Sequence, residues 1–104
     1  MEDYIYLAGL FDGEGCVGCY HVTDRKRPRL YVSIGMTDEA TIDWCINLFG
    51  FGGKTIRKAQ GKWKTLYRWQ VVDKKAEKVL EHILPWLKTK KDTAEQALRD
   101  WRSW

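Results

Sequence analysis

Two carboxylates stand close together near the start of the chain, in Asp12-Gly13-Glu14-Gly15. Gly13 and Gly15 supply turn conformations that bulkier residues resist, so we expect Glu14 to project from a tight turn where a helix ends. Carboxylate oxygens are the ligands that a hard cation such as Mg²⁺ takes. From these residues alone, we expect Glu14 only to satisfy the end of the helix.

A second candidate for chemistry is Cys16-Val17-Gly18-Cys19, a C-x-x-C spacing that elsewhere indicates zinc or redox chemistry. It falls in an expected strand, where residues three apart point to opposite faces, and no second pair completes a metal site. We therefore expect buried, reduced thiols, with Cys45 on the apolar side of a helix.

The residues before the acids favour close helix packing. Ala8 and Gly9 leave almost no side-chain bulk, so another helix can approach them, with Leu7, Leu10 and Phe11 around the contact. A lone helix presenting this groove favours a two-fold homodimer in which the two helices cross. The alternative is that the helix packs within its own monomer.

Length and charge bound the class of protein. The 104 residues predict one domain, residues 1–104, and the net charge of +4 suits a polyanionic partner. No apolar run approaches the roughly 20 residues that a membrane span needs, and the acidic start Met1-Glu2-Asp3 is unlike a signal peptide. We expect a cytoplasmic protein, in a bacterial, viral or organellar setting, without a membrane partner.

Basic residues fall in separate clusters with aromatic residues between them, which is typical of a phosphate-binding face once the clusters converge; a solvated surface is the alternative. The clusters are Arg25, Lys26, Arg27 and Arg29; Lys54, Arg57, Lys58, Lys62 and Lys64; and Lys88, Lys90 and Lys91.

Periodicity predicts the elements that must position these residues. Helices are expected over residues 3–12, from a cap at Thr37 or Asp38 to Phe49, from a cap at Asp73 to Pro85, and over residues 86–104; strands are expected over residues 15–22, 28–36, 54–59 and 65–72. Leu30, Val32 and Ile34 alternate with Arg29, Tyr31 and Ser33, which predicts a core face and a polar face. The order predicts an α+β fold with a four-stranded antiparallel sheet.

The nonapeptide Leu7-Ala8-Gly9-Leu10-Phe11-Asp12-Gly13-Glu14-Gly15 resembles the motif of the LAGLIDADG homing endonucleases, in the single-motif, homodimeric type. The small residues, both acids and the closing glycine coincide with the motif. The resemblance covers nearly the whole chain and implies the αββαββα fold, whose four-stranded antiparallel saddle sheet has helices on one face. It also implies a motif-helix interface made by Leu7, Ala8, Gly9, Phe11 and Asp12.

The resemblance assigns roles to particular residues. Glu14 and the Gly13 carbonyl would bind Mg²⁺ or Mn²⁺ at the scissile phosphate. Leu84-Pro85-Trp86-Leu87-Lys88-Thr89-Lys90 resembles the family's P-x-L-x-x-K passage, which makes Lys90 the catalytic lysine, with Lys88 and Lys91 as competitors. Met36 stands at a catalytic position where a glutamine is common, and a thioether donates no hydrogen bond.

In the resembled family the sheet lies in the DNA major groove. The implied base contacts are Tyr20, Arg27, Arg29, Tyr31, Ser33, Arg57, Arg68 and Gln70, and the implied phosphate contacts are Lys54, Lys58 and Lys62. The implied function is Mg²⁺-dependent cleavage of a palindromic or near-palindromic double-stranded DNA site by a homodimer, serving intron or intein mobility. The alternatives are a non-cleaving DNA-binding protein and an RNA-splicing maturase.

Overall fold

The computed structural model describes residues 2–104; Met1 lies outside the described residues. The elements follow the expected order: α1 (Glu2–Glu14), β1 (Gly15–Tyr20), β2 (Arg29–Met36), α2 (Glu39–Phe49), β3 (Gly53–Arg57), β4 (Leu66–Val72), α3 (Asp73–Ile83), the 3₁₀ turn η1 (Leu84–Trp86) and α4 (Lys91–Arg102). The four strands form one antiparallel sheet in the order β1-β2-β4-β3. The predicted fold class is confirmed.

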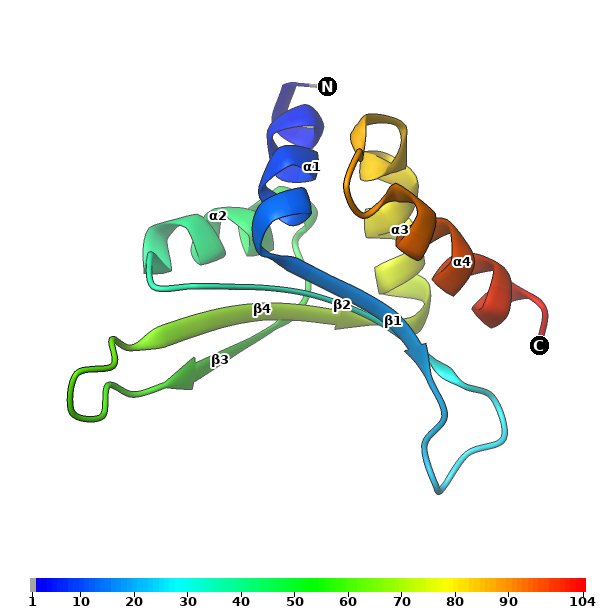
Figure 1. Cartoon of the computed structure of the whole chain (residues 1–104), viewed down its shortest axis with the longest axis horizontal. Helices are drawn as coiled ribbons and strands as arrows, with labels where there is room; N and C mark the ends of the chain where they lie inside the picture. The colour runs from blue at the N-terminus through cyan, green and yellow to red at the C-terminus, as the bar shows by residue number, and fades with distance from the viewer. Residues whose placement is uncertain (1) are drawn as a thin grey trace.

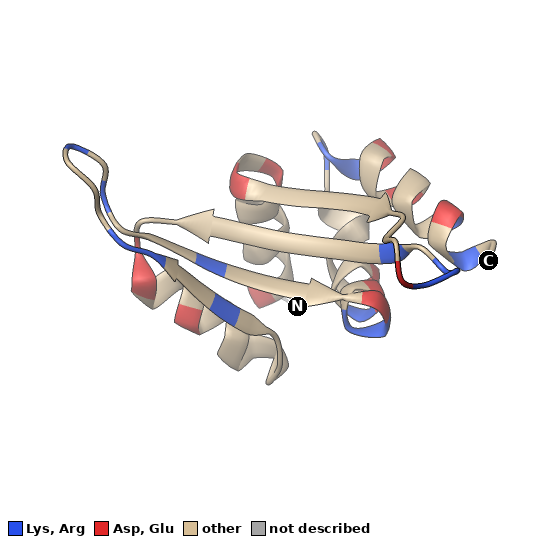
Figure 2. Ribbon diagram, turned by 90° about the horizontal axis from the view of Figure 1, so that it is seen from below, with Lys and Arg blue, Asp and Glu red and all other residues tan. Residues whose placement is uncertain are grey.

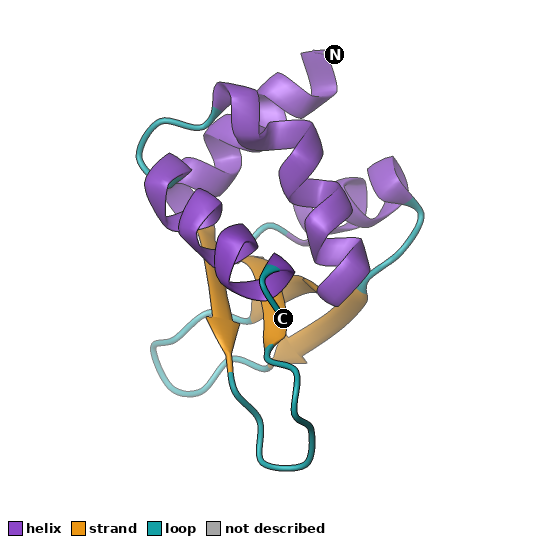
Figure 3. Cartoon of the chain, turned by 90° about the vertical axis from the view of Figure 1, so that its right-hand side faces the viewer, coloured by secondary structure: helices purple, strands orange, loops and turns teal. Residues whose placement is uncertain are grey.

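The molecule has two layers (Figure 3), with helices on one side and the sheet on the other. Figure 1 shows that the helices cover a single face of the sheet. The β1–β2 and β3–β4 connections lie at opposite ends of the sheet, and both bend away from the helices. The uncovered face is therefore concave, with one connection at each end. No helix within residues 2–104 is long and apolar enough to cross a membrane.

The strand register separates the two faces of the sheet. Val17, Val32 and Val71 occupy one cross-strand row, and Ile34 and Trp69 belong to the next row on the same side. All five side chains are buried under the helices. The indole Nε1 of the fully buried Trp69 donates a hydrogen bond of 3.1 Å to the Phe51 carbonyl, so the polar atom of this large core residue is satisfied. The predicted alternation is confirmed.

Helix α1 packs through the side on which an intersubunit contact was expected. Leu7, Ala8 and Phe11 have no exposed surface, because they lie within one turn of each other against the helices and strands of their own subunit. The prediction that these three residues line an intersubunit groove is therefore wrong. Gly9 and Gly13 lie on the opposite, exposed side, and a Cβ added at either would meet no atom within 4 Å.

Helix α2 agrees closely with the prediction. Ile42 and Cys45 are fully buried, and the helix ends at Gly50, whose φ of 78° places it in the left-handed region that glycine tolerates. Asp38 is the N-cap residue, but its carboxylate makes no capping hydrogen bond to the backbone. It instead accepts a hydrogen bond from the Thr41 hydroxyl group.

The last helix begins later than expected, at Lys91 rather than at residue 86. Pro85 lies in the first turn of η1, and Leu87 has extended dihedral angles (φ −72°, ψ 144°), so the helical path is broken before α4 starts. Trp101 is buried, as predicted for a residue that packs on the body, whereas Trp104 is 61% exposed.

Gly52 tests the packing around the central tryptophan. It has a φ of 113°, and a Cβ at this position would overlap the Trp69 indole. We expect Gly52→Ala to lower the free energy of unfolding by at least about 2 kcal/mol, because backbone strain and overpacking add. The neighbouring Gly53→Ala is the control, since its Cβ would make only ordinary contacts, 3.6 Å or more from the atoms of Gln70. Urea unfolding of both variants measures the difference, and equal stabilities would contradict this packing.

Candidate functional site

The end of α1 is fastened to the loop that precedes α4. The Asp12 carboxylate accepts hydrogen bonds from the backbone N–H groups of Lys88 (2.8 Å) and Lys90 (3.0 Å). Burial would raise the pKa of the Asp12 carboxyl, but the backbone N–H groups of Lys90, Lys88 and Thr89 and the Lys90 ammonium outweigh it and lower that pKa below 3.8. Asp12 is thus an ionised carboxylate that accepts hydrogen bonds from the backbone. It provides the acceptor for N–H groups of the non-helical residues before α4.

Lys90 reaches the same helix end with its side chain. Its Nζ donates a hydrogen bond of 2.7 Å to the Asp12 carbonyl oxygen, one of the last carbonyls of α1, where the helix dipole favours a cation. The competing candidates Lys88 and Lys91 are exposed. Among the three candidates, the structure ties the Lys90 ammonium to the helix that carries Glu14.

Glu14 is the last residue of α1, and both it and Gly13 are exposed. Strand β1 begins at the next residue, Gly15, which pairs with Ile34. Met36 ends β2 two residues further along, so it lies near the junction of α1 and β1. Its side chain lies on the helix-covered face, opposite Tyr67, and packs against the core.

The uncovered face of the sheet collects most of the predicted base contacts. By register, this face carries Tyr20, Arg29, Tyr31, Ser33, Arg57, Arg68 and Gln70. The Tyr31 hydroxyl donates to Gln70 Oε1 at 3.1 Å, which fixes both side chains. Ser33 lies on this face but is only 4% exposed, because it is a small residue in the row between Cys16 and Gln70.

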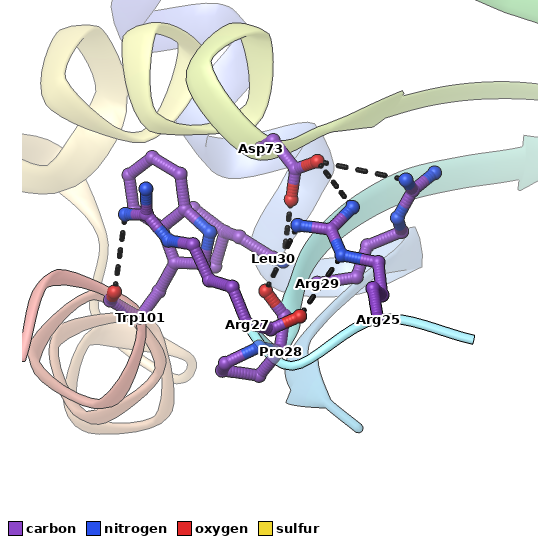
Figure 4. Close-up of polar contacts among 7 residues, drawn as sticks. All are labelled: Arg25, Arg27, Pro28, Arg29, Leu30, Asp73 and Trp101. Atoms are coloured by element: carbon purple, nitrogen blue, oxygen red, sulfur yellow. Dashed lines mark hydrogen bonds and ion pairs between the residues drawn. The ribbon is translucent and has the colours of Figure 1, made fainter. Parts of the chain in front are cut away.

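Arg27 does not lie on this face (Figure 4). Its guanidinium stacks on the Trp101 ring, with Cζ 4.0 Å from the ring centroid, and Nη2 donates to the Trp101 carbonyl oxygen at 3.3 Å. The geometry therefore contradicts its prediction as a base contact. By stacking on Trp101 and binding its carbonyl oxygen, Arg27 connects the β1–β2 connection to α4.

Asp73 fastens the same connection from the other side (Figure 4). Its carboxylate accepts the backbone N–H of Leu30 at 3.2 Å and pairs with Arg25 at 3.0 Å and Arg29 at 3.7 Å. Asp73 was predicted to cap α3, but the helix begins at Asp73 itself, with a φ of 55°, and Val72 is the N-cap residue. Sequence reasoning missed its anchoring role, because its partners lie more than forty positions away.

Lys54 pairs with Trp69, so its side chain lies on the helix-covered side of the sheet, although the residue is exposed at the β3 edge. Its Nζ is 2.7 Å from Glu39 Oε2 and 2.8 Å from Asp43 Oδ1, and hydrogen bonds to Asp43 and Glu39 raise its pKa. The ion pairs of Lys54 thus distinguish it from Lys58 and Lys62, which lie in the β3–β4 connection.

The charge of the uncovered face is one-sided. None of the four strands contains Asp or Glu, and the β3–β4 connection contains none either. Figure 2, which views the molecule from below, shows basic segments on the strands and on both connections, and acidic segments mainly on the helices. A surface with basic side chains and no strand acids is of the kind that favours a polyanionic ligand.

The cysteines offer no competing site. Cys16 pairs with Ser33 and Cys19 with Leu30, so the two side chains point to opposite faces, as predicted. Cys45 is buried and burial raises its pKa to about 11, whereas Cys16 is exposed, contrary to expectation, because it lies on the uncovered face. Within residues 2–104 no group of three His, Cys, Asp or Glu side chains is placed to hold a metal ion.

Comparison with known proteins identifies the fold. No family model and no curated protein sequence matches this sequence. Among solved structures, the homing endonuclease I-CvuI in complex with its target is 23% identical, with a TM-score of 0.75, over 94% of this chain and 64% of that chain. The archaeal intron-encoded homing endonuclease I-Vdi141I, complexed with DNA, is 15% identical, with a TM-score of 0.72, over 95% of this chain and 67% of that one.

The LAGLIDADG meganuclease I-AabMI bound to uncleaved DNA is 23% identical, with a TM-score of 0.69 over 92% of this chain, but this chain spans only 35% of its length. This chain likewise spans less than two thirds of I-CvuI. These similarities show that the chain has the fold of the LAGLIDADG homing endonucleases.

The Asp12 contacts predict a pH-dependent stability. Because folding lowers the Asp12 pKa below 3.8, the carboxylate stabilises the fold above that pH, and its contribution is lost as the pH falls through the folded-state pKa. We expect Asp12→Asn to lower the free energy of unfolding by about 1–2 kcal/mol at pH 7, and by less as the pH falls below 3.8. Urea unfolding across this range tests it, with the exposed Asp24→Asn as the control. A deficit that does not change with pH would contradict this account.

Proposed function

We propose that this chain, which has the fold of the LAGLIDADG homing endonucleases, is one subunit of a homodimeric, Mg²⁺-dependent endonuclease that cuts double-stranded DNA at a near-palindromic site. The observation that carries the proposal is the end of α1, where the Lys90 ammonium binds the Asp12 carbonyl and the exposed Glu14 follows two residues later, next to a sheet whose strands contain no acids. A cleavage assay on DNA sites selected from a random library tests it directly.

Three features support duplex DNA as the partner. The uncovered face is concave between two connections, its strands carry cations and no acids, and its polar side chains stand in cross-strand rows. Strands can read the major groove, where arginine contacts guanine and glutamine contacts adenine. Arg68 and Gln70 alternate along β4 with the core residues and are the leading base contacts. The similar structures I-CvuI, I-Vdi141I and I-AabMI all hold DNA.

The residues at the helix end fit a divalent cation that is shared with DNA. Each chain offers one exposed carboxylate, Glu14, and the carbonyl of Gly13 beside it, which is too few ligands for a closed metal cage. Mg²⁺ retains several waters and is commonly held by one or two carboxylates together with substrate phosphates, so this sparse set suits Mg²⁺ or Mn²⁺. A metal bound there supplies stabilisation of the attacking and leaving oxygens of phosphodiester hydrolysis.

Lys90 supplies positive charge at the same place. Its ammonium hydrogen-bonds to the Asp12 carbonyl oxygen, and Asp12 in turn binds the backbone of the lysine, so the side chain is held in position before any substrate arrives. A preorganised cation stabilises the negative charge that develops on a phosphate during cleavage. Met36 adds no hydrogen-bond donor here, so it has no part in orienting the attacking water.

A homodimer places two such helix ends together. The exposed side of α1 carries Ile5 (43% exposed), Tyr6 (58% exposed), Gly9 and Gly13, which we call the α1 stripe. The two glycines, four residues apart, permit backbone-to-backbone approach of a second helix, and Ile5 and Tyr6 gain from being covered. The stripe replaces Leu7, Ala8 and Phe11 in the proposed interface. If a two-fold axis runs between the α1 stripes of the two subunits, the Glu14 carboxylates at the ends of both helices lie near that axis.

Met36 supports one alternative, a DNA-binding protein that does not cut, because its position lacks the hydrogen-bonding side chain common in the resembled family. The maturase alternative and the role in intron or intein mobility stay predictions from the motif. Specific binding without Mg²⁺-dependent cutting would establish the first alternative, and a preference for structured intron RNA would establish the second.

Glu14→Gln separates cleavage from binding. We expect this substitution to abolish Mg²⁺-dependent cutting while DNA affinity, measured with Ca²⁺, changes less than about threefold, because an amide is a poor metal ligand of nearly the same size. Glu2→Gln, at the other end of the same helix, is the control and should cut normally. Retained cutting would remove Glu14 from the site, and a parallel loss of binding would make it a structural acid.

Gly9→Ala tests the α1 stripe. In the isolated subunit, alanine in this open helical position should raise the free energy of unfolding by about 0.5–1 kcal/mol. In the proposed dimer the added methyl group separates the helices, so we expect dimer dissociation to increase at least tenfold. Sedimentation at several concentrations measures association, with Gly53→Ala as the control. Unchanged association, or a wild-type protein that is monomeric at micromolar concentration with DNA, would refute the interface.

A further inference from the structure

Trp63 is the most exposed large hydrophobic side chain among residues 2–104, with 66% of its surface accessible. It lies in the β3–β4 connection, far from the helices that cover the core (Figure 1). A tryptophan buries a large area when it is covered, and exposed tryptophans are enriched at binding interfaces. Packing within the subunit does not cover this side chain, so its apolar surface is available to a binding partner.

Hydrogen bonds hold the tip of this connection in a defined turn. The Trp63 N–H donates to the Gln60 carbonyl at 3.0 Å, and the two residues form an isolated bridge around Gly61, whose φ is 58°. The Ala59 N–H donates to Thr65 Oγ1 at 3.1 Å. The backbone turn is therefore fixed on both sides of Trp63 without burying its side chain, so the backbone of the tip loses little further entropy on binding.

The surroundings of the indole are basic. Arg57, Lys58 and Gln60 line a hollow together with Trp63, and Lys62 Nζ lies 5.8 Å from the centroid of the Trp63 ring. Lys64 follows directly in the sequence, and no acid occurs between Gly53 and Val72. The partner that complements this surface presents negative charges and apolar surface at short intervals. The backbone of duplex DNA does so, because phosphates alternate with deoxyribose rings.

The tip lies beyond the end of the sheet and bends away from the helices, toward the side of the uncovered face (Figure 1). A duplex lying across that face would continue past the sheet beneath the tip. We infer that Trp63 packs against the deoxyribose surface of the DNA that flanks the recognised site, while Arg57 and Lys58 contact the adjacent phosphates. This inference rests on the proposed function, because it takes duplex DNA as the partner of the sheet.

Two consequences distinguish this contact from those of the lysines. An apolar contact releases no condensed counterions, so it adds affinity without changing the slope of log Kd against log salt concentration, whereas each lysine–phosphate contact contributes about 0.9 to that slope. The contact also reads no base edge, so it depends on the presence of flanking DNA and not on its sequence.

The experiment compares Trp63→Ala and Trp63→Phe with the wild-type protein on two duplexes carrying the same selected site, one with long flanks and one trimmed to the site. Trp104→Ala is the matched control, since Trp104 is similarly exposed (61%) but packs on His21 of the β1–β2 connection, at the other end of the sheet from Trp63. Lys58→Ala is the electrostatic comparator. Circular dichroism and thermal unfolding verify that each variant is folded.

We expect Trp63→Ala to weaken binding to the long duplex about tenfold with an unchanged salt slope, and to bind the trimmed duplex like the wild-type protein. Trp63→Phe should keep most of the affinity, Trp104→Ala all of it, and Lys58→Ala should reduce the salt slope by about 0.9.

Wild-type affinity of Trp63→Ala for the long duplex, an equal loss on both duplexes, or a changed salt slope would overturn the inference while the proposed DNA binding stands. Selective loss of binding to phosphatidylglycerol vesicles, with DNA binding intact, would assign the tip to an anionic membrane and also overturn it. Failure of the wild-type protein to bind any selected duplex would overturn the proposed function together with it.

Discussion

The hydrogen bonds between the Asp12 carboxylate and the backbone of residues 88–90 hold the candidate site together. They join the end of α1 to a segment more than seventy positions later, and they provide partners for backbone N–H groups that the break before α4 would otherwise leave without one. The same loop carries Lys90, whose ammonium returns to the Asp12 carbonyl. One acid of the motif is thus engaged in holding two segments together, whereas the other, Glu14, is exposed.

A second constraint is the division of charge between the two layers. Acids lie mainly on the helices and are absent from the four strands, whereas cations occur in both layers, so the sheet layer is the more basic one although the net charge is only +4. Lys54, the strand cation on the helix-covered face, pairs with Glu39 and Asp43. The distribution of charge, more than its total, makes the uncovered face suitable for a polyanion.

The arginines of the β1–β2 connection show that a basic cluster can serve the fold as well as a ligand. Arg25 and Arg27 are held by Asp73 and Trp101, and they fasten the base of the connection to α3 and α4. The β3–β4 connection has no such anchor in its exposed lysines, and its tip is ordered by its own backbone turn. The two ends of the concave face therefore differ. The β1–β2 connection is attached to the helical layer by side-chain contacts, whereas the β3–β4 connection is held by its own backbone turn and its lysines are exposed.

Local pattern in the sequence was sufficient for the order of elements, the α+β class and the two faces of the sheet, because period-2 and period-3.6 alternation reports which side of an element is buried. It also located the motif acids and most side chains of the uncovered face, including Arg68 and Gln70. It did not reveal that Ala8 faces its own core, that Arg27 stacks on Trp101, or that Asp73 binds Arg25. Those outcomes depend on which distant segments the fold brings into contact, and only the tertiary structure decides whether a small residue or a charge finds its partner within the subunit.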